Sequence, residues 1–149
     1  APPSRGDPPG GLPASRGLAL LTLRAVVLDD LGVLSQTLEP LVDVVPALRA
    51  AGLRTAVLSN ADGPPRPGLV GLTDLLLLSG QTGLRKPDPA AFTDAAVRLG
   101  VAPGECVHVD DLAENVRGAA AAGLVGVLHR TRARTLAELE ALLGRPLRP

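Results

Sequence analysis

Five short apolar runs, alternating with helix-like segments, constrain the fold of this chain more than any other feature. The runs have the length and composition of fully buried strands and cover residues 23–28, 55–58, 74–78, 106–109 and 124–128. The helix-like segments cover residues 39–51, 89–99, 112–122 and 135–143. Each of them is followed directly by glycine, the usual residue beyond a helix end. This alternation predicts a parallel sheet.

Strands that alternate with helices predict a doubly wound, Rossmann-like α/β fold, with five parallel strands and helices on both faces of the sheet. The 149 residues are enough for one domain with a core of its own. We assign that domain to residues 18–149. Residues 1–17 are dense in proline and glycine and predict a flexible tail.

Composition argues against several classes of partner. Fifteen basic and fifteen acidic side chains cancel, so we expect no nucleic-acid partner. The longest apolar run, residues 18–28, is interrupted by Thr22 and Arg24 and is too short to span a bilayer, so we expect no membrane partner. A single cysteine, Cys106, fits a reducing compartment. We therefore expect a soluble, cytoplasmic protein.

Polar side chains lie beyond the ends of four predicted strands. They are Asp29 and Asp30 after the first strand, Ser59 and Asn60 after the second, Lys86 beyond the third, and Asp110 and Asp111 after the fourth. Ligands of parallel sheets gather at the carboxyl ends of the strands. Carboxylates there could hold Mg²⁺, and hydroxyl, amide and ammonium groups suit phosphate oxygens. A carboxylate beside the metal could also attack phosphorus. We expect the first strand to be central, because that order places the two acidic pairs side by side.

Four segments of the sequence carry a resemblance to a known family. VVLDDLGVL, TAVLSN, GLRKPDPAAF and VHVDDLAENVRGAAAAGLVGV resemble, in order, the four motifs of the haloacid dehalogenase-like hydrolase superfamily. The resemblance covers residues 25–143, nearly all of the predicted domain.

The resemblance implies a role for each polar residue. Asp29 matches the nucleophile, which is also a metal ligand, and Leu31 matches a position whose backbone carbonyl contacts the metal. Asp110 and Asp111 match the acidic pair of the fourth motif, with Asp111 as the direct ligand of Mg²⁺. The remaining residues match groups that contact phosphate: Ser59 and Asn60 as the pair that positions it, and Lys86 as the lysine that neutralises nucleophile and phosphate.

Two features depart from the family pattern. Leu31 stands where phosphatase members carry an aspartate that protonates the leaving alcohol and then activates water. Leucine can do neither. In addition, neither the segment between Asp29 and Asn60 nor that between Asn60 and Lys86 has room for the usual helical cap domain. We therefore expect no cap domain and a site that is open to water or covered by another copy in an oligomer.

Each candidate residue also has a purely structural interpretation. Asp111 with Glu114 resembles a helix capping box, Ser59-Asn60 could form a turn, and Lys86 could be a solvated loop residue. Asp30 is interpreted as solvent-facing or helix-capping, His108 as a structural strand residue and His129 as a surface residue.

Two functions remain open. The first is a Mg²⁺-dependent hydrolase, a phosphatase acting through Asp29 on a small phosphorylated substrate or a phosphorylated macromolecule. The second is a non-catalytic domain of the same fold that binds metal and phosphate, or a partner. Leu31 and the missing cap domain favour the second, whereas the presence of Asp29, Lys86 and Asp111 favours the first.

Overall fold

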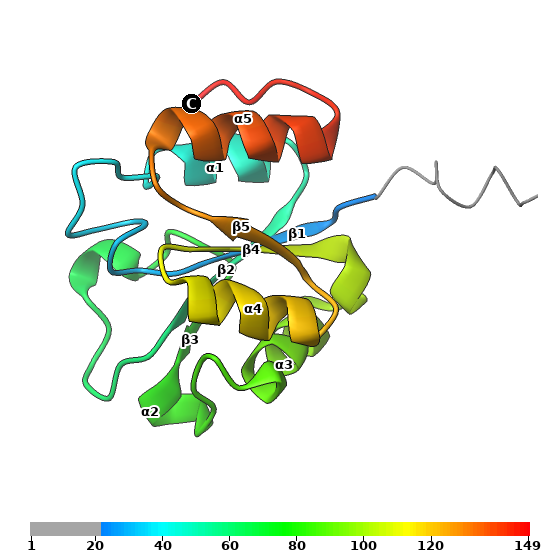
Figure 1. Cartoon of the computed structure of the whole chain (residues 1–149). Helices are drawn as coiled ribbons and strands as arrows, with labels where there is room; N and C mark the ends of the chain where they lie inside the picture. The colour runs from blue at the N-terminus through cyan, green and yellow to red at the C-terminus, as the bar shows by residue number, and fades with distance from the viewer. Residues whose placement is uncertain (1–21) are drawn as a thin grey trace, which may run out of the picture.

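A computed structural model describes residues 22–149 and places five parallel strands in one sheet (Figure 1). The strands are β1 (Ala25–Leu28), β2 (Arg54–Ser59), β3 (Leu75–Leu78), β4 (Cys106–Asp110) and β5 (Val125–Leu128), in the order β3-β2-β1-β4-β5. The predicted fold class and the central position of the first strand are confirmed. The tail predicted for residues 1–17 lies outside the described residues.

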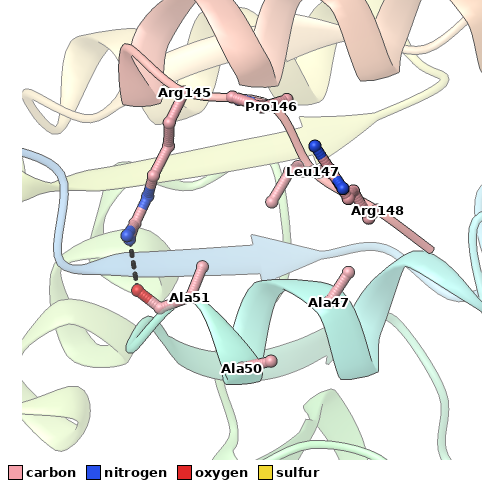
Figure 2. Close-up of a pocket in the computed structure, with 7 residues that line it drawn as sticks. All are labelled: Ala47, Ala50, Ala51, Arg145, Pro146, Leu147 and Arg148. Carbon is pink, nitrogen blue, oxygen red and sulfur yellow. Dashed lines mark hydrogen bonds between the residues drawn. The ribbon is translucent and has the colours of Figure 1, made fainter.

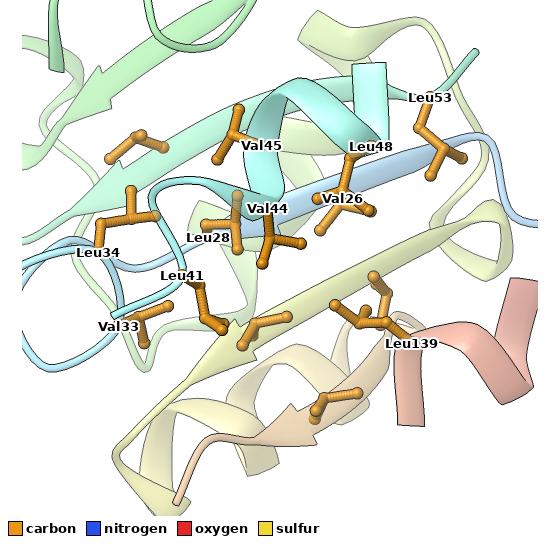
Figure 3. Packing of buried hydrophobic residues seen from close by; sticks show 14 of the residues in the cluster. Val26, Leu28, Val33, Leu34, Leu41, Val44, Val45, Leu48, Leu53 and Leu139 are labelled. Atoms are coloured by element: carbon orange, nitrogen blue, oxygen red, sulfur yellow. The ribbon is translucent and has the colours of Figure 1, made fainter. Parts of the chain in front are cut away.

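Helices cover both faces of the sheet (Figure 1). They are α1 (Val44–Ala50), α2 (Ser79–Thr82), α3 (Pro89–Leu99), α4 (Ala113–Ala121) and α5 (Arg132–Leu143). Successive residues of β1 point to opposite faces, as expected for a strand buried on both sides. Val26 and Leu28 pack in a cluster with residues of α1 and α5 (Figure 3), whereas Ala25 and Val27 pack in a cluster with residues of α3 and α4.

The start of α1 differs from the prediction. The sequence predicts a helix from residue 39, but α1 begins at Val44. The carbonyl of Glu39 instead accepts a hydrogen bond from His129 Nε2, and its carboxylate accepts one from the backbone of Arg132. His129 is buried and also contacts Thr135 Oγ1, so its interpretation as a surface residue is wrong.

The connection from β1 to β2 contains the helix α1, and the connection from β2 to β3 consists of loops and a short turn. A 3-10 turn at Pro67–Leu69 is the one regular element between β2 and β3 in the described chain. These connections add no second domain within residues 22–149, as predicted. None of the helices in this part of the chain has the length and apolar character that a membrane crossing needs.

The pairing register fixes where the polar residues lie. Leu28 pairs with Val57 of β2 on one side and with Val109 of β4 on the other. The residues that follow these three strands therefore lie at the same edge of the sheet. Asp29 is placed beside Asp110, with the end of β2 on its other side.

Candidate functional site

An open cavity of about 270 Å³ lies at the carboxyl edge of the sheet. Its walls come from the end of β2, the loops after β1, β2 and β4, the loop before α3 and the first turn of α4. They comprise Asp29, Leu31, Ser59, Asn60, Lys86, Asp111, Leu112 and Asn115. The structure thus brings together every residue that the sequence predicts for the site, with Asp110 buried next to the cavity rather than lining it.

Lys86 is buried and holds two carboxylates together. Its Nζ donates to Asp29 Oδ1 at 2.8 Å and to Asp110 Oδ2 at 2.9 Å. The backbone of Lys86 is in turn held by the Asn60 amide, which donates to the Lys86 carbonyl and accepts from the Lys86 N–H, both at 2.9 Å. The interpretation of Lys86 as a solvated loop residue is therefore wrong. Asn60 positions the lysine loop, while a phosphate contact by Asn60 stays a prediction.

Asp110 is completely buried and accepts hydrogen bonds from several groups. Besides Lys86, they are His108 Nε2 at 2.8 Å, the Leu112 N–H at 3.0 Å and Asn115 Nδ2 at 3.2 Å. Burial alone would raise the pKa of Asp110, but the hydrogen bond from His108 and the charge of Lys86 hold that pKa well below its usual range. Asp110 is therefore an ionised anchor for the lysine.

His108 also contributes to the site, through a hydrogen bond to Asp110, and the sequence analysis did not include it among the site residues. It is fully buried, and its ring meets that of Phe92 edge-on at a centroid distance of 4.8 Å. Burial lowers the pKa of His108, so the imidazole is neutral and donates through Nε2 to Asp110. Its Nδ1 has no hydrogen-bond partner within the described chain. A signal existed: His108 lies two residues before Asp110, and such residues share one side of a strand.

Asp30 is buried, and its interpretation as solvent-facing or helix-capping is wrong. Its carboxylate forms a bidentate ion pair with Arg66, with Nε at 3.0 Å from Oδ2, and accepts from Ser35 Oγ at 2.8 Å. Its carbonyl accepts from the N–H groups of residues 33–35. Asp30 therefore shapes the loop that presents Leu31. Its distant partner Arg66 carries no local sequence signal.

Asp111 lies directly against the backbone of the loop that follows β1. Gly32 in that loop has φ +88°, and a Cβ at this position would lie 2.2 Å from Asp111 Oδ2. The side chain of Asp111 does not cap α4, which begins without a side-chain cap. One oxygen each of Asp29, Asp110 and Asp111 lie within 4.8 Å of one another. Asp111 therefore belongs to the acidic cluster, and its interpretation as a helix cap is wrong.

The cluster holds more negative than positive charge. Burial raises the pKa of Asp29 to about 7; Lys86 lowers it, while the charge of Asp110 and the neighbouring Asp111 carboxylate add to the rise. A cation placed between these carboxylates would favour their ionised forms. The donor set of carboxylate oxygens suits a hard divalent ion such as Mg²⁺.

Replacing Gly32 with alanine is expected to disturb this cluster. The positive φ costs about 1–2 kcal/mol for a residue with Cβ, and the new Cβ also forces the Asp111 carboxylate to move. Gly52→Ala is a matched control, because Gly52 has φ +85° and a Cβ added there would meet no atom within 4 Å. Chemical denaturation should show the larger loss of unfolding free energy for Gly32→Ala. Equal losses in the two variants would contradict the close contact with Asp111.

A second hollow, of about 260 Å³, lies between α1 and the C-terminal segment (Figure 2). It is lined by Ala47, Ala50, Ala51, Arg145, Pro146, Leu147 and Arg148. Arg145 donates to the Ala51 carbonyl at the end of α1. Within residues 22–149, these walls hold no carboxylate, hydroxyl or imidazole side chain.

Comparisons with known proteins agree with this geometry. The model of a family described as "Hydrolase: haloacid dehalogenase-like hydrolase" matches residues 14–123. A solved structure of an uncharacterized protein from Corynebacterium glutamicum is 36% identical, with a TM-score of 0.76 over 85% of this chain and 98% of that one.

Two curated relatives match in sequence. Mouse acyl-CoA dehydrogenase family member 10 is 32% identical over 141 residues, which cover 91% of this chain and 12% of the relative. A phosphoserine phosphatase from Thermus thermophilus is 42% identical over 88 residues, 53% of this chain and 34% of the relative. The chain thus spans only a minor part of the length of these two relatives.

Proposed function

The chain belongs to the haloacid dehalogenase-like hydrolase family, and we propose that it is a Mg²⁺-dependent phosphatase acting through an aspartyl-phosphate on Asp29. The observation that carries the proposal is the buried pair of Lys86 and Asp29 next to the Asp111 carboxylate. A phosphatase among the relatives supports phosphate monoesters as the substrate class, whether small molecules or phosphorylated macromolecules.

Asp29 would perform nucleophilic catalysis. One of its carboxylate oxygens forms a bond to phosphorus while the ester P–O bond breaks, and the electron pair leaves with the alcohol oxygen. Water then attacks the phosphorus, the bond to Asp29 breaks, and phosphate departs as a water proton passes to the solvent. The ammonium of Lys86, fixed 2.8 Å from Asp29 Oδ1, offsets the negative charge that gathers there. Ser59, buried at the edge of the cavity, would donate to a phosphate oxygen.

The residues fit a divalent ion because three carboxylates face one ammonium. Asp29 and Asp111, with the Leu31 carbonyl, would hold Mg²⁺, which would supply positive charge beside the phosphoryl group. Asp110 would act as the anchor of Lys86 rather than as a direct ligand, since its oxygens already accept hydrogen bonds from four groups.

The decisive experiment is a screen of phosphate monoesters with and without Mg²⁺, together with 2-haloacids as a separate substrate class. Phosphate release that requires Mg²⁺ and Asp29 supports the proposal. Halide release would instead indicate a dehalogenase. Binding of Mg²⁺ and phosphate without turnover of any substrate would favour the non-catalytic domain, which neither of the two curated relatives favours.

Mg²⁺ is expected to raise the melting temperature through Asp111. A ligand at 100 times its Kd adds about 2.7 kcal/mol to the free energy of unfolding. Asp111→Ala should lose most of this gain, whereas Asp94→Ala, a change on the surface of α3, should keep it. The melt must be followed by circular dichroism or calorimetry, because the chain has no Trp or Tyr. Equal shifts in the two variants would place the metal elsewhere.

The affinity for Mg²⁺ is expected to depend on pH through Asp29. Its raised pKa of about 7 means that below this pH a proton competes with the ion for the carboxylate. The apparent Kd should therefore rise about tenfold for each pH unit below 7 and level off above it. Titration calorimetry in two buffers should detect proton release at pH 6 and little at pH 8. A Kd that stays constant from pH 5.5 to 8 would contradict the raised pKa.

A further inference from the structure

Two leucines in the walls of the cavity expose apolar surface and do not belong to the hydrophobic core. Leu31 and Leu112 are 48% and 49% exposed, and both line a cavity whose other walls are polar. They come from the loops after β1 and β4, which are neighbouring strands, and Asp111 of the second loop lies close against Gly32 of the first. Exposed leucine surface gains free energy when an apolar group covers it.

The same cavity offers no spare proton donor for a leaving group. Its titratable residues within the described chain are Asp29, Lys86 and Asp111. Asp29 is the proposed nucleophile, Lys86 is held by two carboxylates, and Asp111 belongs to the acidic cluster. Asp30, the next carboxyl along the chain, is bound to Arg66 and Ser35. None of these residues is therefore free to protonate the leaving oxygen, so this oxygen departs as an anion.

We propose, on the basis of the phosphatase function above, that the substrates are aryl phosphates whose ring packs between Leu31 and Leu112. When the ester P–O bond breaks, the electron pair stays on the phenolic oxygen, and no proton is needed. A phenol has a pKa of about 10, so phenolate is a stable leaving group, whereas an alkoxide is far more basic. The apolar walls and the absence of an acid thus both favour aryl phosphates.

Four phosphorylated compounds separate the effect of the ring from the effect of a good leaving group. Phenyl phosphate has a ring and a good leaving group, cyclohexyl phosphate a ring and a poor one, acetyl phosphate a good leaving group without a ring, and ethyl phosphate neither. We expect kcat/KM for phenyl phosphate to exceed that for cyclohexyl phosphate by about 10²-fold or more, the scale of a missing general acid. The KM for phenyl phosphate should be lower than that for acetyl phosphate, because the ring adds contact with the leucines.

The ring contact is tested with Leu112→Ser. Its KM for phenyl phosphate should rise by about tenfold, the effect of roughly one lost methylene contact in an apolar pocket. Leu38→Ser is the matched control, since Leu38 is 100% exposed and lies outside the cavity. Equal KM values in the two variants would overturn the ring contact. A phosphotyrosine peptide tested beside phenyl phosphate shows whether the ring belongs to a small molecule or to a protein side chain.

The outcomes distinguish this inference from the proposed function. If acetyl phosphate phosphorylates Asp29, detected as the mass of one phosphoryl group, but phenyl phosphate has no advantage over ethyl phosphate, the aryl specificity is wrong while the phosphatase chemistry stands. If neither acetyl nor phenyl phosphate modifies Asp29 or releases phosphate in the presence of Mg²⁺, the phosphatase function itself is overturned.

Discussion

Replacing Asp29 with asparagine is expected to abolish phosphate release, lowering turnover on the order of 10⁴-fold or more. The change removes the nucleophile and keeps the size of the side chain, so only binding and the charge of Lys86 would remain to assist water. Phosphate release from the best substrate of the monoester screen, in the presence of Mg²⁺, measures the effect. The phosphoryl adduct should also disappear from the mass spectrum of the intact protein.

The loss of activity should not come from unfolding. Asp29 has a higher pKa in the folded protein than the ordinary value of 3.8, so the folded state binds this proton more tightly than the unfolded chain. The stability that this proton contributes is present below pH 3.8 and is lost as pH rises through about 7. At pH 8 without Mg²⁺, Asp29→Asn should therefore melt no lower than wild type, and Lys86 keeps Asp110 as its partner.

A surface carboxylate provides the control for this prediction. Asp62 is mostly exposed, pairs with Arg85 and lies outside the cavity, so Asp62→Asn should retain full turnover. Phosphate release by a folded Asp29→Asn variant at more than about one percent of the wild-type rate would contradict nucleophilic catalysis by Asp29, which requires a far larger loss.

The parts of the fold that depend on local sequence could be predicted. Each buried strand needs only a short apolar run, and α3 runs from Pro89 to Leu99 as predicted, because the proline at its start and Gly100 beyond its end mark its bounds locally. The central position of β1 followed from the acidic pairs, since Asp29 and Asp110 can approach only if their strands are neighbours.

The parts that were missed depend on distant partners. The first turn of the predicted helix from residue 39 is lost because Glu39 bonds to His129 and Arg132, roughly ninety positions along the chain. Asp30 is buried because Arg66 reaches it from the loop after β2. Neither pairing has a periodic or spaced signal in the sequence. A buried carboxylate does demand a partner, but that requirement does not say which residue supplies it.

The candidate site was predicted as a set of residues but not as a network. The sequence placed Asp29, Lys86 and Asp111 at one edge, and the structure brings them to one cavity. It did not reveal that Asn60 holds the backbone of Lys86, or that His108 supports Asp110 from below. Asn60 and Lys86 lie in different loops, so their contact depends on how the strands are arranged, whereas His108 and Asp110 share one side of β4.

Leu31→Asp is expected to raise turnover of alkyl phosphates by about 10²-fold or more, the low end of general acid–base effects. The resemblance to phosphatase members places an acid at this position, and Leu31 lines the cavity beside Asp29. A new carboxyl near Asp29 and Asp111 would have a raised pKa, because like charges and partial burial favour its protonated form. It could therefore protonate the leaving oxygen near neutral pH and then activate the water that attacks the aspartyl-phosphate.

The gain should be selective. Phenyl and acetyl phosphates already have good leaving groups, so the step that forms the phosphoryl-enzyme should speed up much less for them than for ethyl or cyclohexyl phosphate. Phenyl phosphate would also lose half of its apolar contact, since Leu112 alone would remain. The ratio of kcat/KM for aryl phosphates to kcat/KM for alkyl phosphates should therefore fall, because alkyl phosphates gain an acid and aryl phosphates lose part of the ring contact.

Leu31→Asn separates proton transfer from polarity, because asparagine has nearly the shape of aspartic acid but its amide does not titrate near neutral pH. Leu31 is half-exposed, and its loop is held by Asp30, so both variants should fold with little loss of stability. A gain in Leu31→Asp that is absent in Leu31→Asn assigns the missing function to a proton carrier. If Leu31→Asp folds and binds Mg²⁺ but gains no turnover, the lack of an acid at this position is not what limits the reaction. A domain that binds phosphate without hydrolysing it then explains better why Asp29, Lys86 and Asp111 are kept together.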